Sequence, residues 1–202
     1  MAAPRWLMFD LGGVLVDFAG PRELQAFLPA PAAADLRLQM AACAATDAFE
    51  RGAIAPEEFA ERFVRDWQVR LSPAEFLVRY VDWLRGLYPG AAELLAQLGR
   101  RHRLACLSNS NLAHWERSEC MRWLQRTLDL ALSSHQLRLR KPQPEIFAAA
   151  LARLGCRAAD VVYFDDLAAN VAAARAAGFV AHQVDGFDAL QARLLELGLL
   201  DD

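Results

Sequence analysis

The sequence predicts an α/β protein in which a parallel sheet, covered by helices on both faces, is interrupted after its first strand by an insert made of helices. Three observations support this prediction. A short apolar strand ends at Asp10 and is followed by Gly12-Gly13, a turn signal. Across residues 17–87, apolar residues recur every three or four positions, as on one face of a helix. After residue 90, strands alternate with helices of roughly ten residues, which is the pattern of a parallel sheet.

In the first half of the chain, prolines and Gly52 divide the insert into separate helices, and no strand is expected there. Proline suits the first turn of a helix, because the N–H that it lacks has no helical partner at that position. The first strand covers residues 5–9. The helices expected in the insert are residues 21–27, 33–46, 56–67 and 73–87.

The second half of the chain alternates between the two kinds of element. The expected strands are residues 104–107, 130–133, 161–164 and 179–184. The expected helices are residues 91–101, 111–126, 144–154, 168–177 and 187–197. This layout predicts a core domain of residues 1–16 and 88–202 and a helical cap domain of residues 17–87, an arrangement typical of a catalytic core with a lid.

Composition narrows the function classes. Hydrophobic residues make up 55% of the 202 residues and charged residues 23%, which favours a packed core over disorder. A net charge of −3 argues against nucleic acid and acidic membranes as partners. The chain contains neither an apolar run long enough to span a membrane nor a signal peptide, so we expect a cytoplasmic protein. The apolar positions of the cap suit a core or an interface equally, so the oligomeric state is not predicted.

The four cysteines have irregular spacing and form no CxxC pair. This argues against a zinc site and against a disulfide framework, and it favours buried thiols in a reducing compartment. They are Cys43, Cys106, Cys120 and Cys156.

Polar residues follow four of the strands or the loops between them. In open parallel sheets, ligands bind beyond the carboxyl ends of the strands, so these residues are the candidates for a functional site. They are Asp10, Ser108-Asn109, Arg140-Lys141-Pro142 and Asp165-Asp166.

The three aspartates point to a magnesium site. Asp10 alone is equally consistent with a turn cap. Adjacent carboxylates at Asp165 and Asp166 repel each other, and a hard cation relieves that repulsion; capping the helix near Ala168 is the alternative, and it needs only one of them. Together with Asp10 they supply the few carboxylates that Mg²⁺ prefers.

Three further residues suit phosphate. Ser108 and the backbone N–H of Asn109 can hold phosphate oxygens just before a helix begins, although a simple turn or cap has the same sequence. Lys141 can stabilise charge on a transferring phosphoryl group, the alternative being an exposed loop cation. Lys141 is the single lysine among 22 basic residues, which favours a specific role.

Four segments, taken together and in order, resemble the motifs of the haloacid dehalogenase-like (HAD) hydrolase superfamily, a group mostly of Mg²⁺-dependent phosphatases. They cover nearly the whole predicted core. The segments are FDLGGVLVD at residues 9–17, LSNSN at 107–111, RKPQPEIF at 140–147 and FDDLAANVAAARAAGF at 164–179. The resemblance implies a Rossmann-like doubly wound core and an inserted cap of the all-helical (C1) type, which agrees with the insert read from the pattern above.

The resemblance also implies roles for individual residues. Asp10 is the nucleophile and forms an aspartyl-phosphate with a small phosphate monoester. Ser108 donates a hydrogen bond to the phosphoryl oxygens, and Lys141 neutralises their charge.

The resemblance implies a metal site as well. Asp10 and Asp166 are direct Mg²⁺ ligands, Asp165 lies close by and acts through water, and the backbone carbonyl of Gly12 completes the coordination by the protein.

The chain departs from the family pattern at Gly12. Many family phosphatases carry a second aspartate there, which protonates the leaving oxygen and then activates water. Loss of such a group removes about 10²–10⁴ in rate. Either another group or water transfers the proton, or the leaving group needs little help. Within the superfamily, the chain resembles bacterial members that also read FDLG and hydrolyse sugar phosphates, including α-D-glucose 1-phosphate, whose anomeric oxygen leaves readily.

Two alternatives remain open at this point. One is a weak or inactive homologue that acts as a binding protein. The other is a metal-free 2-haloacid dehalogenase, which would leave the Asp165-Asp166 pair unexplained. His114 and His135 are candidate proton donors, with a partly exposed surface position as the alternative for each.

Overall fold

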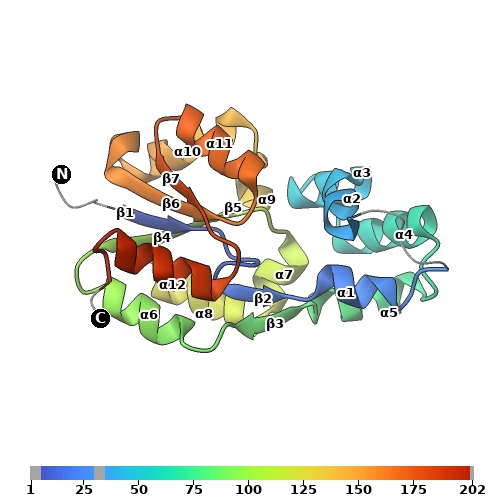
Figure 1. The fold of residues 1–202 in the computed structure, drawn as a ribbon. Coiled ribbons are helices and arrows are strands. Elements are labelled where there is room, and N and C mark those ends of the chain that lie inside the picture. Colours follow the sequence, from blue (N-terminus) through green and yellow to red (C-terminus); the bar gives the residue numbers. More distant parts are fainter. Residues whose placement is uncertain (1–5, 30–34, 201–202) are drawn as a thin grey trace.

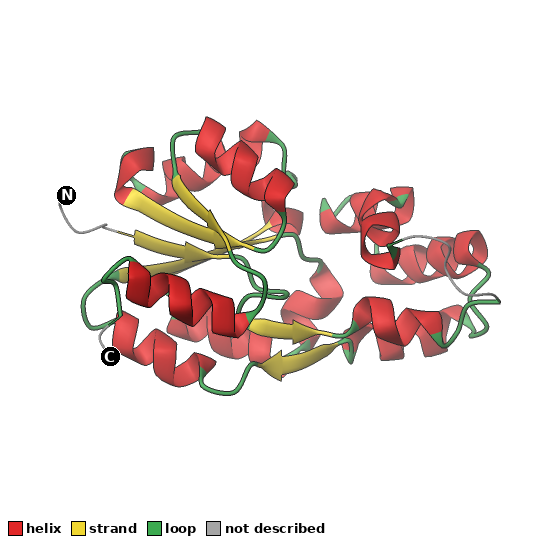
Figure 2. Cartoon of the chain, viewed as in Figure 1, coloured by secondary structure: helices red, strands yellow, loops and turns green. Residues whose placement is uncertain are grey.

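The computed structural model describes residues 6–29 and 35–200. It has two parts, a sheet with helices on both faces and a smaller group of helices at one end of it (Figures 1 and 2). We call these the core and the cap. Two of the expected elements extend beyond the described residues. These are the first strand, at residue 5, and the helix expected over residues 33–46, at residues 33 and 34.

The core contains the predicted parallel sheet. Its strands are β1 (Trp6–Phe9), β4 (Arg103–Ser108), β5 (Leu130–Ser133), β6 (Val161–Asp165) and β7 (Val180–Gln183). They lie in the order β5-β4-β1-β6-β7, and every neighbouring pair is parallel. The predicted α/β fold class, a Rossmann-like sheet, is therefore confirmed.

Side chains of the central strand β1 alternate between two hydrophobic clusters, as the two-residue period of a strand requires. Leu7 and Phe9 belong to the cluster that includes residues of α6, α8 and α12. Trp6 and Met8 belong to the cluster on the other face, which includes residues of α10 and α11. The helices of these two layers are α6 (Ala91–Leu98), α8 (Glu119–Thr127), α12 (Phe187–Glu196), α10 (Pro144–Leu154) and α11 (Ala168–Ala176). Because both faces are covered, the carboxyl edge of the sheet is where a ligand can reach it.

The cap is built from five helices around an aromatic cluster. Trp83, Phe76, Phe59 and Phe63 are fully buried there, and Trp67 stacks on Phe63 at a ring distance of 5.1 Å. Packing is thus the role of these aromatic residues. The helices are α1 (Gly20–Gln25), α2 (Leu36–Ala42), α3 (Ala44–Glu50), α4 (Pro56–Trp67) and α5 (Pro73–Val81).

The prediction that residues 17–87 contain no strand is wrong. β2 (Val16–Phe18) and β3 (Leu84–Leu87) form an antiparallel ribbon that leads into and out of the cap. The helix expected over residues 73–87 ends at Val81 for this reason, and Gly86 has φ +124°, which no helix allows. The predicted domain boundaries fall within this ribbon.

Two expected helices are each divided in two. The described part of residues 33–46 belongs to α2 and α3, which are separated at Cys43, and residues 111–126 belong to α7 (Leu112–Arg117) and α8, which are separated at Ser118. Both separating residues have extended backbone, with ψ of 130°. A single extended residue changes the direction of the chain but leaves the three- and four-residue spacing of the apolar residues intact. The helical pattern in the sequence therefore continues across the break. The structure also contains two short elements that were not expected, α9 (Ser134–Leu137) and the 3₁₀ helix Ala158–Asp160.

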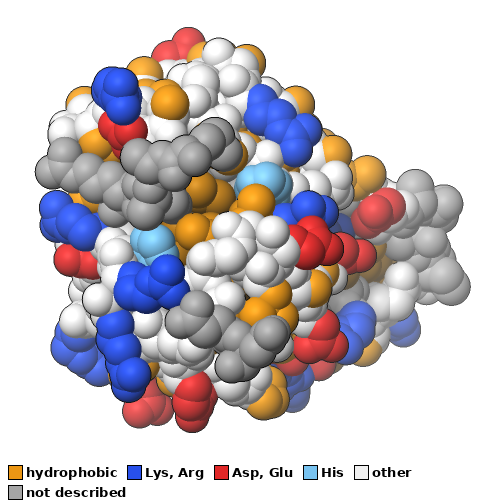
Figure 3. Space-filling view, turned by 60° about the vertical axis from the view of Figure 1, so that its left-hand side comes forward, with side chains coloured by type: hydrophobic (Ala, Val, Ile, Leu, Met, Phe, Trp, Pro, Cys, Tyr) orange, Lys and Arg blue, Asp and Glu red, His pale blue; other side chains and the backbone are white. Residues whose placement is uncertain are grey.

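Among the described residues, no helix is both long enough and apolar enough to cross a membrane. On the face shown in Figure 3, basic and acidic side chains are interspersed, in keeping with the small net charge.

Candidate active site

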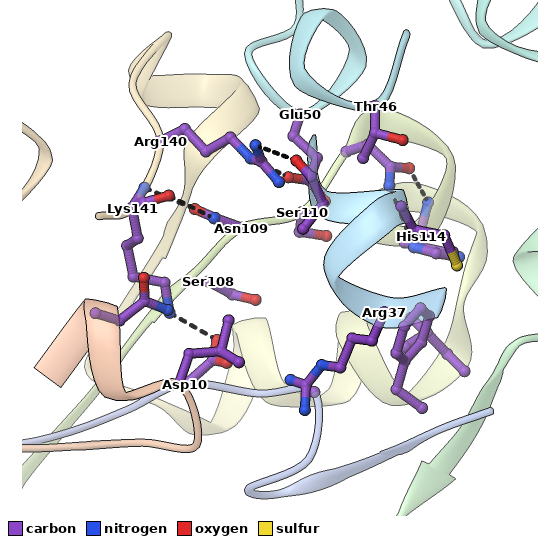
Figure 4. Close-up of a pocket in the computed structure, with 18 of the residues that line it drawn as sticks. Asp10, Arg37, Thr46, Glu50, Ser108, Asn109, Ser110, His114, Arg140 and Lys141 are labelled. Atoms are coloured by element: carbon purple, nitrogen blue, oxygen red, sulfur yellow. Dashed lines mark hydrogen bonds and ion pairs between the residues drawn. The ribbon is translucent and has the colours of Figure 1, made fainter. Parts of the chain in front are cut away.

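The carboxyl ends of β1, β4 and β6 meet at one cavity between the core and the cap (Figure 4). The cavity leaves about 140 Å³ open to water-sized molecules. The sequence-predicted residues that line it are Asp10, Gly12, Ser108, Asn109, Arg140, Lys141 and the candidate proton donor His114. Asp165 and Asp166 lie beside it, and Asp10, Asp165 and Asp166 each offer a carboxylate oxygen within 4.8 Å of the other two. The predicted nucleophile, phosphate-binding and metal-binding residues are therefore brought together, whereas the candidate proton donor His135 is not.

Asp10 is held at the floor of the cavity. Its backbone N–H donates to the carbonyl of Phe164 on β6 at 2.8 Å, which fixes the end of β1 against the neighbouring strand. Burial raises the pKa of Asp10 to about 7, the positive charge of Lys141 opposes that rise, and the charges of Asp165 and Asp166 add to it. The site is thus a concentration of negative charge that a cation would stabilise.

Lys141 connects Asp10, which follows β1, to Asp165 at the end of β6. Its Nζ lies 2.9 Å from Asp10 Oδ1, and it donates to Asp165 Oδ2 at 2.7 Å and to the Tyr163 hydroxyl at 2.9 Å. The side chain is 1% exposed, so the alternative of an exposed loop cation is wrong. Burial alone would lower the pKa of Lys141, but Asp10 and Asp165 outweigh it and raise the pKa above its ordinary value.

The side chain of Asn109 holds Lys141 in place. Its Oδ1 accepts from the Lys141 backbone N–H at 2.9 Å, and its Nδ2 donates to the Lys141 carbonyl at 3.0 Å. This bracing role was not among the sequence predictions, which considered only the backbone N–H of Asn109.

Asp165 has its oxygens occupied by protein donors. Oδ2 accepts from Lys141 and Tyr163, and Oδ1 accepts from the backbone N–H of Leu167 at 2.9 Å. Asn170 donates to both oxygens, at 3.0 and 3.1 Å. Burial would raise the pKa of Asp165, but Lys141 and the other donors lower it below its ordinary value. Asp165 therefore positions Lys141 and the start of α11.

Sequence reasoning missed Tyr163 and Asn170. Tyr163 lies two residues before Asp165, on the same face of β6, and Asn170 lies about one helical turn after it. Both spacings are visible in the sequence and could have identified them.

The two carboxylate oxygens of Asp166 have different surroundings. Its Oδ2 forms an ion pair with Arg37 from cap helix α2. Its Oδ1 is buried and has no hydrogen-bond partner among the described residues. Burial raises the pKa of Asp166, and the charge of Arg37 opposes that rise. Arg37 carries no motif in the sequence, and nothing there separates it from the other arginines.

The donor set fits a hard divalent cation. The three carboxylates are clustered, and the buried Oδ1 of Asp166 lacks the partner that a buried polar atom normally has. Carboxylate oxygens are the ligands that Mg²⁺ prefers.

Gly12 and Gly13 differ in whether the surrounding structure has room for a larger residue. Gly13 has φ +83°, and a Cβ there would collide with the Asp166 carboxylate, so only glycine fits. At Gly12 a Cβ would meet Phe18 at an ordinary distance of 3.6 Å. Gly12 is therefore not required by the space around it.

Neither histidine is the exposed residue that the sequence left open. His114 is buried, its Nε2 lies 2.7 Å from the Tyr80 carbonyl, and its Nδ1 lies 3.2 Å from Asn111 Nδ2. Burial lowers the pKa of His114 to about 4. His135 is also buried, with Nδ1 2.6 Å from Ser133 Oγ, and it does not line the cavity. Both rings are engaged in packing between elements.

A family model described as haloacid dehalogenase-like hydrolase matches residues 4–178. The chain belongs to the haloacid dehalogenase-like hydrolases. Phosphatase MT3486 of Mycobacterium tuberculosis is 32% identical over 133 residues, which are 63% of this chain and 60% of that protein. The chain thus spans less than two thirds of the length of this relative.

Two solved HAD structures share the fold. The HAD family enzyme BT-2542 of Bacteroides thetaiotaomicron, in a magnesium complex, has a TM-score of 0.71 at 20% identity, over 91% of this chain and 94% of that one. L-2-haloacid dehalogenase of Xanthobacter autotrophicus, with chloropropionic acid covalently bound, has a TM-score of 0.62 at 20% identity, over 98% and 85%. Phosphatase and dehalogenase chemistry therefore both occur among the proteins that this chain resembles.

Proposed function

We propose that this HAD hydrolase is a Mg²⁺-dependent phosphatase of the helical-cap (C1) branch, acting on a small phosphate monoester through an aspartyl-phosphate on Asp10. The observation that supports it best is the free, buried Oδ1 of Asp166 beside Asp10 and Lys141. The phosphatase relative and the magnesium complex of BT-2542 support the same chemistry. In this proposal, residues 17–87 are the cap and residues 1–16 and 88–202 the core.

The proposed reaction has two steps. A carboxylate oxygen of Asp10 attacks phosphorus, the bond from phosphorus to the leaving oxygen breaks, and that oxygen keeps the electron pair and takes a proton from solvent water, since Gly12 supplies none. Water then attacks phosphorus and gives up a proton to the solvent. The bond from phosphorus to the Asp10 oxygen breaks, the electron pair returns to the Asp10 carboxylate, and inorganic phosphate leaves. Ser108 donates a hydrogen bond to the phosphoryl oxygens, as does the backbone N–H of Asn109, and Lys141 neutralises their charge.

Mg²⁺, held by Asp10, Asp166 and the carbonyl of Gly12, would supply further positive charge beside the phosphoryl oxygens. Asp165 contributes by holding Lys141, since its own oxygens already accept hydrogen bonds. The water-mediated contact of Asp165 with the metal stays a prediction.

We further propose a sugar phosphate as substrate, with the phosphate on the anomeric carbon. Gly12 supplies no acid for the leaving oxygen, which favours a leaving group that departs readily. The cavity is also lined by Thr46 and Ser110, whose buried hydroxyl groups have no hydrogen-bond partner among the described residues and suit a sugar hydroxyl.

The test is phosphate release from a panel of phosphorylated sugars, with and without Mg²⁺. Wild type should require Mg²⁺ and prefer 1-phosphates, Asp10→Asn should be inactive, and Asp17→Asn serves as the control because Asp17 forms an exposed pair with Arg22. Activity that persists in Asp10→Asn, or without a divalent metal, would overturn the mechanism. Equal turnover of all the sugar phosphates would overturn the 1-phosphate preference alone.

A dehalogenase is the second candidate. The ion pair from Arg37 to Asp166 favours it, because each carboxylate of the Asp165-Asp166 pair then has a protein partner without a metal. Halide release from 2-haloacids in the presence of a chelator would identify this function. A stable phosphoryl or beryllofluoride adduct on Asp10 without turnover would instead identify a binding protein.

A further inference from the structure

The contact from Arg37 to Asp166 joins two side chains of very different exposure. Asp166 lies at the end of β6 and its side chain is 2% exposed, whereas the side chain of Arg37 is 39% exposed. Figure 4 shows Arg37 extending from cap helix α2 toward the loop that follows Asp10. Arg37 can therefore leave this contact and return to water at little expense, but Asp166 cannot follow it.

The formal charges of the site explain why Arg37 lies there. The three clustered aspartates and Lys141 leave two negative charges uncompensated. Arg37 neutralises one of them. A divalent cation would neutralise both, and a guanidinium on Asp166 would then add surplus positive charge beside the cation. Arg37 and the cation of the proposed function are thus competitors for Asp166.

The charge balance reverses when a phosphate group enters. A phosphate monoester brings a charge of about −1.5 to −2 at neutral pH, so a further cation is again favourable. Arg37 lines the same cavity as Asp10, Ser108 and Lys141. Its planar fork of N–H donors matches phosphate oxygens in a way that a single ammonium group does not.

The backbone of Arg37 is fixed while its side chain is free to move. The Asp35 carboxylate caps α2 by accepting from the N–H of Arg37 at 2.9 Å, and Leu36 and Met40 anchor this helix in the hydrophobic cluster of the cap. A change of partner thus needs only rotation of the side chain within the cavity.

We propose that Arg37 is a two-position residue: it pairs with Asp166, yields this carboxylate to the divalent cation when the cation binds, and then binds the phosphoryl oxygens of the substrate. This inference rests on the proposed function. In this sequence of events the cation binds first and the phosphate second. Arg37 then connects the cap directly to the bound phosphate.

The test measures two affinities by calorimetry, for Mg²⁺ alone and for inorganic phosphate in the presence of Mg²⁺. In Arg37→Gln the affinity for Mg²⁺ should rise several-fold, because the competitor is lost. The affinity for phosphate should fall about tenfold or more, because a charge-assisted hydrogen bond is lost. Arg62→Gln is the matched control, since Arg62 forms an exposed pair with Glu58 elsewhere in the cap.

The opposite signs separate this proposal from a structural role. A general disturbance of the cap would lower both affinities, and that result, or no change relative to Arg62→Gln, would overturn the proposal. Arg37→Lys is the second variant, and it should keep part of the phosphate affinity because it keeps the charge.

If wild type hydrolyses phosphate esters with Mg²⁺ but the opposite shifts in Mg²⁺ and phosphate affinity are missing, this inference alone fails. If wild type binds no Mg²⁺, both proposals fail.

Discussion

The guanidinium of Arg140 and the carboxylate of Glu50 form an ion pair that ties the core to the cap. Arg140 belongs to the loop that carries Lys141, and Glu50 ends helix α3 (Figure 4). The two side chains are only 13% and 14% exposed. Arg140 also donates to the carbonyl of Ala41 at the end of α2, at 2.8 Å. The residue before Lys141 thus holds two cap helices.

Arg140→Gln should therefore destabilise the protein substantially. It leaves the Glu50 carboxylate buried without its cation, and breaking a buried pair on one side costs about 3 kcal/mol or more in unfolding free energy. Urea denaturation measures this value. The double variant Arg140→Gln/Glu50→Gln should recover much of the loss, whereas Arg62→Gln, in an exposed pair, should change stability by less than about 1 kcal/mol. A double variant as unstable as Arg140→Gln would contradict the ion-pair account.

A second prediction concerns Gly13. In Gly13→Ala the new Cβ meets the Asp166 carboxylate, so both stability and Mg²⁺ affinity should fall. Gly155→Ala is the matched control, because Gly155 also has positive φ, +62°, but nothing lies within 4 Å of a Cβ there. The control should lose about 1–2 kcal/mol from backbone strain and keep its Mg²⁺ affinity. Equal Mg²⁺ affinity in the two variants would show that Gly13 does not shape the metal site.

A third prediction concerns the missing acid. Gly12→Asp places a carboxyl group where many family phosphatases carry one, and a Cβ at Gly12 would make only ordinary contacts with Phe18. For esters with poor leaving groups, kcat should rise by up to about 10², because a positioned proton donor contributes about 10²–10⁴. Gly12→Asn has the same size and no proton to transfer. Identical kcat values for the two variants would rule out proton transfer as the cause of any gain.

A fourth prediction follows from His114. Burial lowers the pKa of His114 to about 4, below its ordinary value of 6.5 in an unfolded chain. Between those values the unfolded chain binds a proton that the folded chain refuses, so stability falls as the pH falls from about 6.5 to about 4. The contribution reaches about 3 kcal/mol. The unfolding free energy of wild type should therefore fall more steeply with decreasing pH than that of His114→Gln; parallel pH profiles would contradict this assignment.

The sequence was sufficient for the sheet and for the residues at its carboxyl edge. The strands of the core are apolar runs between turn residues, and polar residues such as Asp10 and Asp165 mark where they end. It was insufficient where structure depends on distant pairing. β2 and β3 are short and pair across the whole cap, so neither carries a local strand signal.

The same limit applies to the site. Arg37 reaches Asp166 across 129 positions of sequence, and only the packing of the cap brings the two together. The partner of Arg140 is equally distant, with 90 positions separating it from Glu50. No spacing rule links such pairs, so cap residues that face the cavity become visible only in the folded structure.

The most direct test of the central claim is chemical trapping of the aspartyl-phosphate on Asp10. Wild type is mixed with Mg²⁺ and a phosphate ester, treated with borohydride, which reduces an acyl phosphate to an alcohol, and examined by peptide mass spectrometry. Homoserine should appear at position 10, and only when both Mg²⁺ and the ester are present. Release of phosphate without any modification at position 10, or with the modification at another aspartate, would contradict it.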